Sequence, residues 1–388
     1  MLTIANRMQR IQPFYVMELL ARAKKLEAAG RPIIHMEIGE PDFITPQPII
    51  QAGKAALSRG ETHYTAALGL PQLRQAISEY YQKRFSVDIA AKRIIITPGA
   101  SGALQLVLSI LINPGEGVLM ADPGYPCNRH FVELVGGKPI GIAVDESNNY
   151  QLTTELVSQH WNSDCRAVLL ASPSNPTGTL MPIDELRKLH QFLQQQGGIL
   201  IVDEIYQELI YDQSPTTALS IADDIFIINS FSKYFGMTGW RLGWLVAPEE
   251  AIEPIDRLAQ NIFLAASTLS QHAALAAFSE ETTEILEQRR EIFGQRRDYL
   301  FTALKEIGFS IPVKPQGAFY LYTGCQPFTE NSSQFANQLL ETAGVAITPG
   351  RDFGSNKPEQ HLRFAYTTHL EKLEQGIEQL QQFIHHNQ

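Results

Sequence analysis

The chain is poor in cysteine and in long apolar runs, and both shortages restrict what it can be. It has three cysteines, Cys127, Cys165 and Cys325, and no pair of them has the spacing of metal ligands. Disulfide frameworks are typical of short secreted chains with an even number of cysteines. No stretch approaches the roughly 20 apolar residues of a membrane span, and the first residues contain no apolar core of signal-peptide length. We therefore expect reduced thiols, no metal site, no membrane partner and a cytoplasmic protein.

Positive charge is also in short supply. The chain has 41 acidic residues against 31 lysines and arginines, which gives a net charge of -10. Nucleic acids and anionic membranes attract basic surfaces, so we expect neither as a general partner. The glycine patterns GxGxxG and GxxxxGK[ST] are absent as well, which argues against a nucleotide-dependent dehydrogenase.

What is present is a regular alternation of short apolar runs and helix-like segments. With 388 residues and 44% apolar residues, two packed domains are expected. Strands that are apolar throughout belong to a sheet that is covered on both faces, which predicts an α/β architecture with a mostly parallel sheet. The expected strands are 93–97, 118–121, 167–171, 199–202, 225–229 and 242–246. The expected helices among them are 103–111, 182–195 and 252–278.

The pattern changes after about residue 285. A long charged helix is expected at 287–308, followed by strands and by a last helix from His369. The N-terminal segment, with a helix at 14–29 and a strand at 33–38, is too short to be a domain. We therefore expect a large domain at 46–285, and a smaller α+β domain formed by 1–45 and 286–388. The expected strands of the smaller domain are 309–313, 318–322, 345–348 and 362–365.

The most specific chemical signal is the stretch SFSKYFGMTGWRLGW, which follows the apolar run IFIIN. A lysine just beyond a buried strand, among aromatic residues and glycines, is desolvated. Desolvation lowers its pKa and makes the amine nucleophilic toward a carbonyl. Ser230, Ser232 and Arg241 nearby supply donors suited to a phosphate. We therefore expect Lys233 to be catalytic; the alternative is an ordinary surface lysine.

Two further motifs follow apolar runs. Asp203 ends the run ILIVD, and in open α/β sheets ligands bind at the carboxyl ends of strands. A carboxylate there could keep a ring nitrogen protonated, and Tyr206 could reach the same ligand; a helix cap is the alternative for Asp203. Asn175 lies in the turn Asn-Pro-Thr-Gly, which can also be purely structural.

Three weaker signals complete the set of candidate binding residues. In TPGASGALQ, the backbone N–H groups of Ala100, Ser101 and Gly102 stand before a helix, where they would bind a phosphate. Tyr125, in DPGYPCN, could stack on a flat ring or simply pack beside its turn. Arg363, in HLRFAYT, could bind a carboxylate at two points or form a structural salt bridge.

Taken together, these motifs resemble the class I and II aminotransferases, which are fold-type-I enzymes dependent on pyridoxal 5'-phosphate (PLP). The resemblance runs in order along nearly the whole chain, from the loop at 39–42 to Arg363. The Asn-Pro-Thr-Gly turn, the pair Asp203 and Tyr206, and Ser-Phe-Ser-Lys with Arg241 eight residues after the lysine all have the family's spacing. The family's fold is a large domain, with a mostly parallel sheet between helices, and a smaller α+β domain.

The resemblance implies a role for each candidate residue. Lys233 carries PLP as a Schiff base and moves a proton, and Asp203 pairs with the pyridinium nitrogen. Arg363 binds the substrate α-carboxylate, with help from the backbone of Gly39. Tyr64, in THYTAALGL, matches a tyrosine that reaches the phosphate in the neighbouring subunit, so a homodimer is implied. The remaining implied contacts are Tyr125 on the ring face, Asn175 at the ring O3' and at the substrate carboxylate, Tyr206 at the O3', and Ala100, Ser101, Ser230, Ser232 and Arg241 at the phosphate.

The amino donor is less determined. Some aspartate-preferring bacterial relatives carry a lysine in the phosphate loop, where this chain has Ser101. We expect transamination of an L-amino acid with a 2-oxo acid such as 2-oxoglutarate or pyruvate, with alanine or another apolar donor slightly favoured over aspartate. The alternatives are aspartate aminotransferase activity, a PLP lyase of the β-C–S lyase type, and a PLP-binding regulator without turnover. Such regulators usually carry an added helix-turn-helix domain, whereas the aminotransferase-like region here begins within the first forty residues.

Overall fold

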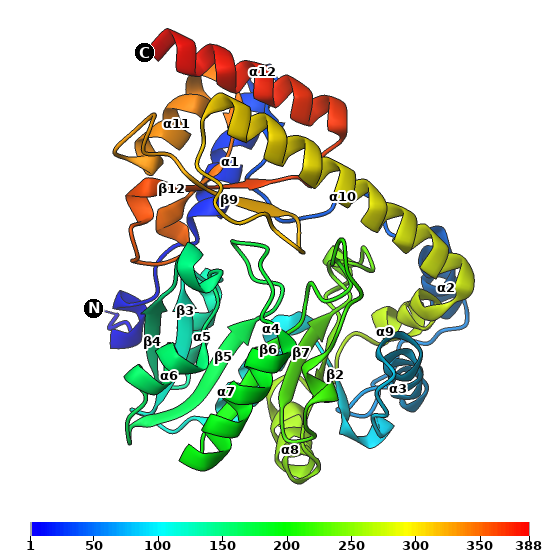
Figure 1. Ribbon diagram of the computed structural model, residues 1–388. Helices are drawn as coiled ribbons and strands as arrows, with labels where there is room; N and C mark the ends of the chain where they lie inside the picture. Colours follow the sequence, from blue (N-terminus) through cyan, green and yellow to red (C-terminus); the bar gives the residue numbers. More distant parts are fainter. Residues whose placement is uncertain (1, 388) are drawn as a thin grey trace.

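A seven-stranded sheet forms the centre of the larger part of the molecule (Figure 1). The computed structural model describes residues 2–387. All neighbouring strands are parallel except β8, which runs antiparallel to both of its neighbours. The expected mostly parallel α/β sheet is therefore confirmed. In spatial order the strands are β2 (Ile94–Thr97), β8 (Gly243–Val246), β7 (Phe226–Ser230), β6 (Ile199–Asp203), β5 (Cys165–Ala171), β3 (Gly117–Asp122) and β4 (Lys138–Ala143).

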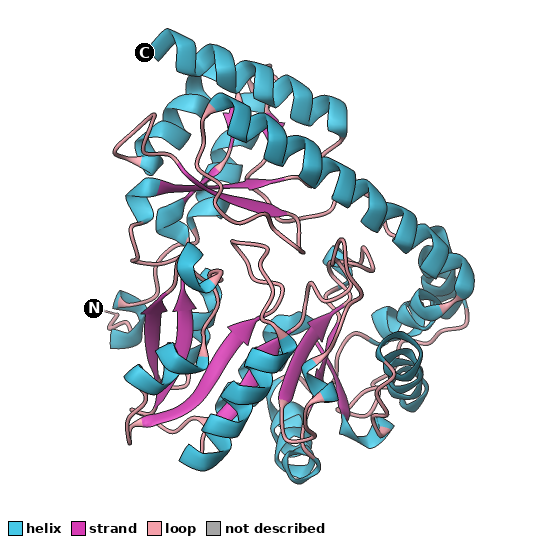
Figure 2. Cartoon of the chain, viewed as in Figure 1, coloured by secondary structure: helices cyan, strands magenta, loops and turns pink. Residues whose placement is uncertain are grey.

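Helices cover both faces of this sheet, which explains its apolar strands (Figure 2). Alternate side chains of one strand enter different cores: Val168 packs with α7 (Ile183–Gln196), whereas Leu169 packs with α4 (Gly99–Leu111) and α8 (Ile252–Ile262). The edge strand β4 was not predicted. Its side chains are mostly exposed or half-buried, so it has no apolar run.

The expected single helix at 252–278 is wrong. The chain leaves α8 at Ile262 and takes a positive φ of 63° at Leu264. A second helix, α9 (Thr268–Ala274), then begins after Ser267, whose side chain accepts a hydrogen bond from the backbone N–H of Ser270. This N-cap starts a new helix in the middle of an apolar segment whose periodicity looks continuous. The other helices of this part are α2 (Gln47–Ser58), α3 (Pro71–Phe85), α5 (Pro126–Leu134) and α6 (Thr154–His160).

The smaller part of the molecule combines both ends of the chain. A three-stranded antiparallel sheet has the order β11 (Thr348–Pro349), β12 (His361–Ala365) and β9 (Tyr320–Gly324). The N-terminal strand β1 (Ile34–His35) pairs in parallel with β10 (Val345–Ala346), so the N-terminal segment packs against the C-terminal part as expected. The helices of this part are α1 (Tyr15–Ala28), α10 (Glu280–Ile307), α11 (Ser332–Ala343) and α12 (Leu370–Asn387).

Three expectations for this part need correction. The strand expected at 309–313 is only a single bridge between Ser310 and Gly324. The strand expected at 33–38 is confined to Ile34–His35, because Met36 divides its backbone hydrogen bonds between two segments and the carbonyls of Glu37 and Ile38 accept from side chains. The long helix begins seven residues earlier than expected, at Glu280, so the predicted domain boundary after 285 falls inside α10. No helix in the described part of the chain is long and apolar enough to cross a membrane.

Candidate active site

One cavity lies at the carboxyl ends of the central strands, between the large sheet and the smaller part of the molecule. Its volume is about 200 Å³, and like most small-molecule and cofactor sites it is concave, with apolar side chains and a few polar groups in its lining. Strands β5, β6 and β7 each deliver a lining residue at or near their last position: Ala171, Asp203 and Ser230. The predicted residues that line it are Gly39, Ala100, Ser101, Tyr125, Asn175, Asp203, Tyr206, Ser230, Ser232, Lys233, Arg241 and Arg363.

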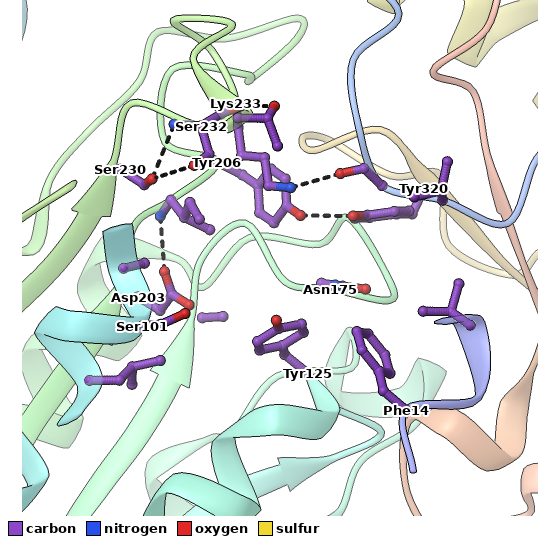
Figure 3. Close-up of a pocket in the computed structure, with 18 of the residues that line it drawn as sticks. Phe14, Ser101, Tyr125, Asn175, Asp203, Tyr206, Ser230, Ser232, Lys233 and Tyr320 are labelled. Atoms are coloured by element: carbon purple, nitrogen blue, oxygen red, sulfur yellow. Dashed lines mark hydrogen bonds between the residues drawn. The ribbon is translucent and has the colours of Figure 1, made fainter. Parts of the chain in front are cut away.

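Lys233 lies three residues beyond β7 and points into this cavity (Figure 3). Its Nζ donates a hydrogen bond to the carbonyl oxygen of Gly39 at 2.7 Å and lies 5.9 Å from the ring centre of Tyr206. Burial lowers the pKa of Lys233 from 10.5 to about 8, partly offset by the charge of Glu40. At pH 7 about a tenth of an amine with this pKa is unprotonated, against less than one in a thousand at the ordinary value, and the unprotonated form is the one that attacks a carbonyl.

Asp203 is the last residue of β6 and is almost completely buried. Burial raises its pKa from 3.8 to about 6, although the backbone N–H of Ile205, 3.0 Å from Oδ1, and the charge of Lys233 both lower it. A buried carboxylate is expensive unless a cation or a protonated ring nitrogen faces it. The side chain does not cap a helix, because a short turn region and no α-helix follows β6.

Donors for an anion gather at one end of the cavity. Helix α4 begins directly after β2, so Ala100 and Ser101 occupy its first turn, where backbone N–H groups are free to bind an anion. The hydroxyls of Ser230 and Ser232 lie 3.0 Å apart. A Cβ atom on Gly99 would lie 2.9 Å from Nη2 of Arg241, so the glycine lets the guanidinium approach this helix end.

Arg363 occupies the opposite end of the cavity, where it is 2% exposed. Its Nη1 donates to Oδ1 of Asn175 at 2.9 Å, and its Nη2 donates to the backbone carbonyl of Glu37 at 2.5 Å. The guanidinium carbon lies 4.3 Å from the ring centre of Tyr320. Nε is buried without a partner, and within residues 2–387 no carboxylate forms an ion pair with this arginine. The arrangement differs from a structural salt bridge and leaves a charge available to an external carboxylate.

Several residues that line the cavity were not found from the sequence. Phe14, Val16 and Met17 come from the N-terminal segment at the start of α1, and the ring of Phe14 meets Tyr125 edge-on at 6.3 Å. Tyr320, on β9, is the other important one, because its hydroxyl lies 2.8 Å from that of Tyr206. These residues belong to ordinary helix and strand patterns, so no local signal separates them from core residues. The remaining unpredicted lining residues are Ile38, Leu104, Ala171, Ile205 and Thr238.

Two predicted binding residues do not line this cavity: Gly102, which lies inside α4, and Tyr64. The side chain of Tyr64 is 83% exposed, in the loop between α2 and α3. It therefore contributes nothing to the site of its own chain. A role for Tyr64 requires a second copy of the chain.

The chemistry of the lining residues fits PLP. The cavity has a helix N-terminus with hydroxyls and Arg241 for a phosphate, Asp203 for a pyridinium nitrogen, Tyr125 for the ring face and a lysine for the aldehyde. The described part of the chain contains no group of three or more His, Cys, Asp or Glu side chains placed to hold a metal ion.

Comparisons with known proteins agree with this geometry. The family model "Aminotransferase class I and II" matches residues 31–380. The (5-formylfuran-3-yl)methyl phosphate transaminase of Methanocaldococcus jannaschii is 36% identical, over 98% of this chain and 99% of its own length. The aspartate aminotransferase of Geobacillus stearothermophilus is 33% identical, over 98% of both chains. The crystal structure of an aminotransferase from Mycobacterium tuberculosis superposes with a TM-score of 0.96, at 32% identity and with full coverage of both chains.

Proposed function

This chain belongs to the class I and II aminotransferases, and from that premise we propose that it uses PLP to transfer the amino group of an L-amino acid to a 2-oxo acid such as 2-oxoglutarate or pyruvate. The observation that carries the proposal is the position of the Lys233 amine. The amine is half-buried, with a pKa lowered to about 8, and it shares the cavity with a buried carboxyl group, Asp203, and a buried arginine, Arg363, that has no ion-pair partner among residues 2–387.

Asp203 and Lys233 have different roles in the proposed reaction: the first stabilises charge, and the second holds the cofactor and transfers a proton. When bound, PLP supplies an electron sink for the charge that develops when a substrate loses its α-proton. Asp203 stabilises the protonated ring nitrogen on which that sink depends, and its own burial strengthens the pairing. Lys233 would hold the cofactor through its amine, and once released this amine would be the base that takes the proton from the substrate α-carbon and returns it to the cofactor carbon that the lysine had held.

Arg363 and the residues around it determine how the bound substrate is oriented. Its guanidinium is fixed by Asn175 and by the backbone of Glu37, so its open edge has a defined direction before the substrate arrives. A carboxylate held there at two points aligns the α-carbon with respect to Lys233. The apolar side chains of Phe14 and Val16 form part of the wall and help to exclude water.

We further propose that the donor is neutral, such as alanine or a larger apolar amino acid, and is used at least as well as aspartate. The cationic side chains that line the cavity are Lys233, Arg241 and Arg363, and each has another role in this proposal. Ser101 is neutral, so it offers no charge to a second carboxylate. The wall contributed by the N-terminal segment and its neighbours is apolar: Phe14, Val16, Met17, Ile38 and Leu104.

A panel of amino donors with 2-oxoglutarate and pyruvate as acceptors tests the donor class. We expect kcat/KM for alanine or a larger apolar donor to equal or exceed that for aspartate. A hundredfold preference for aspartate over every neutral donor would overturn this part of the proposal. The same assay measures ammonia, because a lyase releases ammonia and a keto acid without consuming an acceptor.

Reduction with borohydride tests the cofactor site. The purified protein should absorb visible light, and borohydride should fix PLP to the peptide that contains Lys233. Because the pKa of Lys233 is lowered to about 8, the rate at which the PLP-free protein takes up PLP should rise as pH increases through about 8, and not only near 10.5. Lys233→Ala should lose turnover and still bind PLP noncovalently. Label found on another lysine would refute the assignment.

A further inference from the structure

Tyr320 lies where three parts of the site meet. It is on β9 in the smaller part of the molecule, it is 1% exposed, and it lines the cavity. No sequence motif distinguishes it from a core residue, and the proposed roles of the other residues do not use it.

The first contact of Tyr320 is through its hydroxyl. This oxygen lies 2.8 Å from the hydroxyl of Tyr206, and the two rings are nearly perpendicular, with centres 5.8 Å apart (Figure 3). Both side chains are buried, so solvent does not compete for the bond. If Tyr206 directs its proton to a ligand in the cavity, the hydroxyl of Tyr320 must donate to the oxygen of Tyr206.

The second contact is with the backbone at Gly39. A Cβ atom built on Gly39 would lie 1.8 Å from the Tyr320 hydroxyl oxygen, so only a glycine permits this approach. The carbonyl oxygen of the same glycine accepts the hydrogen bond from Lys233. The Tyr320 hydroxyl is therefore held in place by packing as well as by hydrogen bonding.

The third contact is with Arg363, whose guanidinium carbon lies 4.3 Å from the centre of the Tyr320 ring. A cation over an aromatic face is attracted to the ring. The positive charge also makes the hydroxyl of that ring a stronger donor, and correspondingly Arg363 lowers the pKa of Tyr320, against the larger effect of burial, which raises it.

We propose that Tyr320 is a positioning residue for both the substrate and the cofactor. Its ring supports Arg363, which binds the substrate carboxylate. Its hydroxyl donates to Tyr206 and so strengthens the hydrogen bond that Tyr206 gives to the phenolic oxygen of PLP. This inference rests on the proposed function. The support of Arg363 belongs to the ring and the donation to Tyr206 belongs to the hydroxyl, so substitutions can separate the two roles.

Tyr320→Phe keeps the ring and removes only the hydroxyl. A weaker donor at Tyr206 leaves the phenolic oxygen more basic, so the pH at which the visible band of the PLP-loaded protein changes should rise by roughly 0.5–1 unit, the scale of one hydrogen bond. KM for the amino acid should stay within about twofold, because the ring under Arg363 remains. Tyr320→Leu removes the ring as well and should raise KM by about 3- to 30-fold.

Two comparisons make the test specific. Tyr206→Phe should shift the spectral midpoint further than Tyr320→Phe, and the double variant should shift it no further than Tyr206→Phe alone, since the hydroxyls act in series. Tyr322→Phe is the matched control: Tyr322 is on the same strand and is buried, but it does not line the cavity, so its midpoint should equal that of the wild type. A Tyr320→Phe midpoint equal to that of the control, or additive shifts in the double variant, would overturn the proposal.

A further measurement separates this inference from the proposed function. A double-mutant cycle of Tyr206→Phe and Tyr320→Phe, read from the melting temperature of the PLP-free protein, reports the hydroxyl pair without the cofactor. Coupling between the two changes is expected, and strict additivity would contradict the pair itself. Wild-type protein that fails borohydride labelling at Lys233 would instead refute the proposed function, whatever the cycle shows.

Discussion

At the scale of single residues, the site depends on charged groups that the fold buries without full compensation. Asp203 and Arg363 are almost fully enclosed and Lys233 is half-buried, and desolvation moves the pKa of the lysine down to about 8 and that of the aspartic acid up to about 6. Such groups are costly for stability unless a ligand supplies the missing partner. Their presence together in one cavity is therefore a mark of function and not of packing.

Arg363→Lys tests whether the guanidinium fork matters. The substitution keeps the charge and loses the second hydrogen-bonding edge, so KM for the amino donor should rise and kcat should also fall through poorer alignment. Complete loss of the contact, as in Arg363→Ala, should cost roughly 2–5 kcal/mol, or about 30- to several-thousand-fold in kcat/KM. Steady-state kinetics with one donor measure both changes. A loss below about 1 kcal/mol in both variants would show an arginine of only structural importance.

At the scale of elements, α1 brings the N-terminal segment to the cavity, and Asp352 holds its first turn. The backbone N–H groups of Tyr15 and Val16 donate to the two carboxylate oxygens of Asp352, at 3.0 and 3.3 Å. The first N–H groups of a helix have no partner within the helix, and a carboxylate also interacts favourably with the helix dipole. This contact fixes the place of Phe14 and Val16 in the cavity wall.

Asp352→Ala should loosen this wall. The loss of the cap should cost about 0.5–2 kcal/mol locally, so amide hydrogens at 15–18 should exchange faster, and KM for an apolar donor should rise. Glu341→Ala is the matched control, because Glu341 also reaches α1, through Arg22, but forms an exposed ion pair. That variant should exchange like the wild type, since exposed pairs contribute about 0–1 kcal/mol. Equal exchange at 15–18 in both variants would contradict the role of Asp352.

At the scale of the whole molecule, one chain leaves several large apolar side chains exposed. Ile44, Leu57, Tyr64 and Leu264 are 69%, 59%, 83% and 54% exposed. We propose, on this ground and from the resemblance of the loop around Tyr64, that the enzyme is a homodimer in which Tyr64 reaches the phosphate site of the partner subunit.

Sedimentation and PLP retention test the dimer together. Sedimentation velocity at assay concentration should show a dimer, and Tyr64→Phe should weaken PLP retention by about 1 kcal/mol or somewhat more, because the hydrogen bond it loses has a charged acceptor. Tyr299→Phe, which removes a hydroxyl on α10, serves as the control and should retain PLP like the wild type. An active monomer would refute the shared site.

The sequence by itself determined the strand cores and the positions of the chemical motifs. Strands β5, β6 and β7 are apolar because helices cover both faces of the sheet. Their apolar runs showed where each strand ends, and ligands bind at the carboxyl ends of such strands, so residues from Asn175 to Lys233 were identified there. Only local patterning was needed for these predictions. The edge strand β4 and the break after α8 escaped them, because half-exposure and a single cap leave little trace in hydrophobic periodicity.

Only the tertiary structure decided which distant residues meet. The Tyr206 and Tyr320 hydroxyls are 114 positions apart in the chain, and Arg363 is 326 positions from the carbonyl of Glu37 that fixes it. Phe14 reaches the cavity because the N-terminal strand β1 pairs with β10 and because Asp352 caps α1. Such contacts depend on packing between elements, and a tyrosine in a strand has the same local pattern whether it faces a core or a cofactor. The sequence therefore indicates the chemistry, and the packing determines the partners through which each group acts.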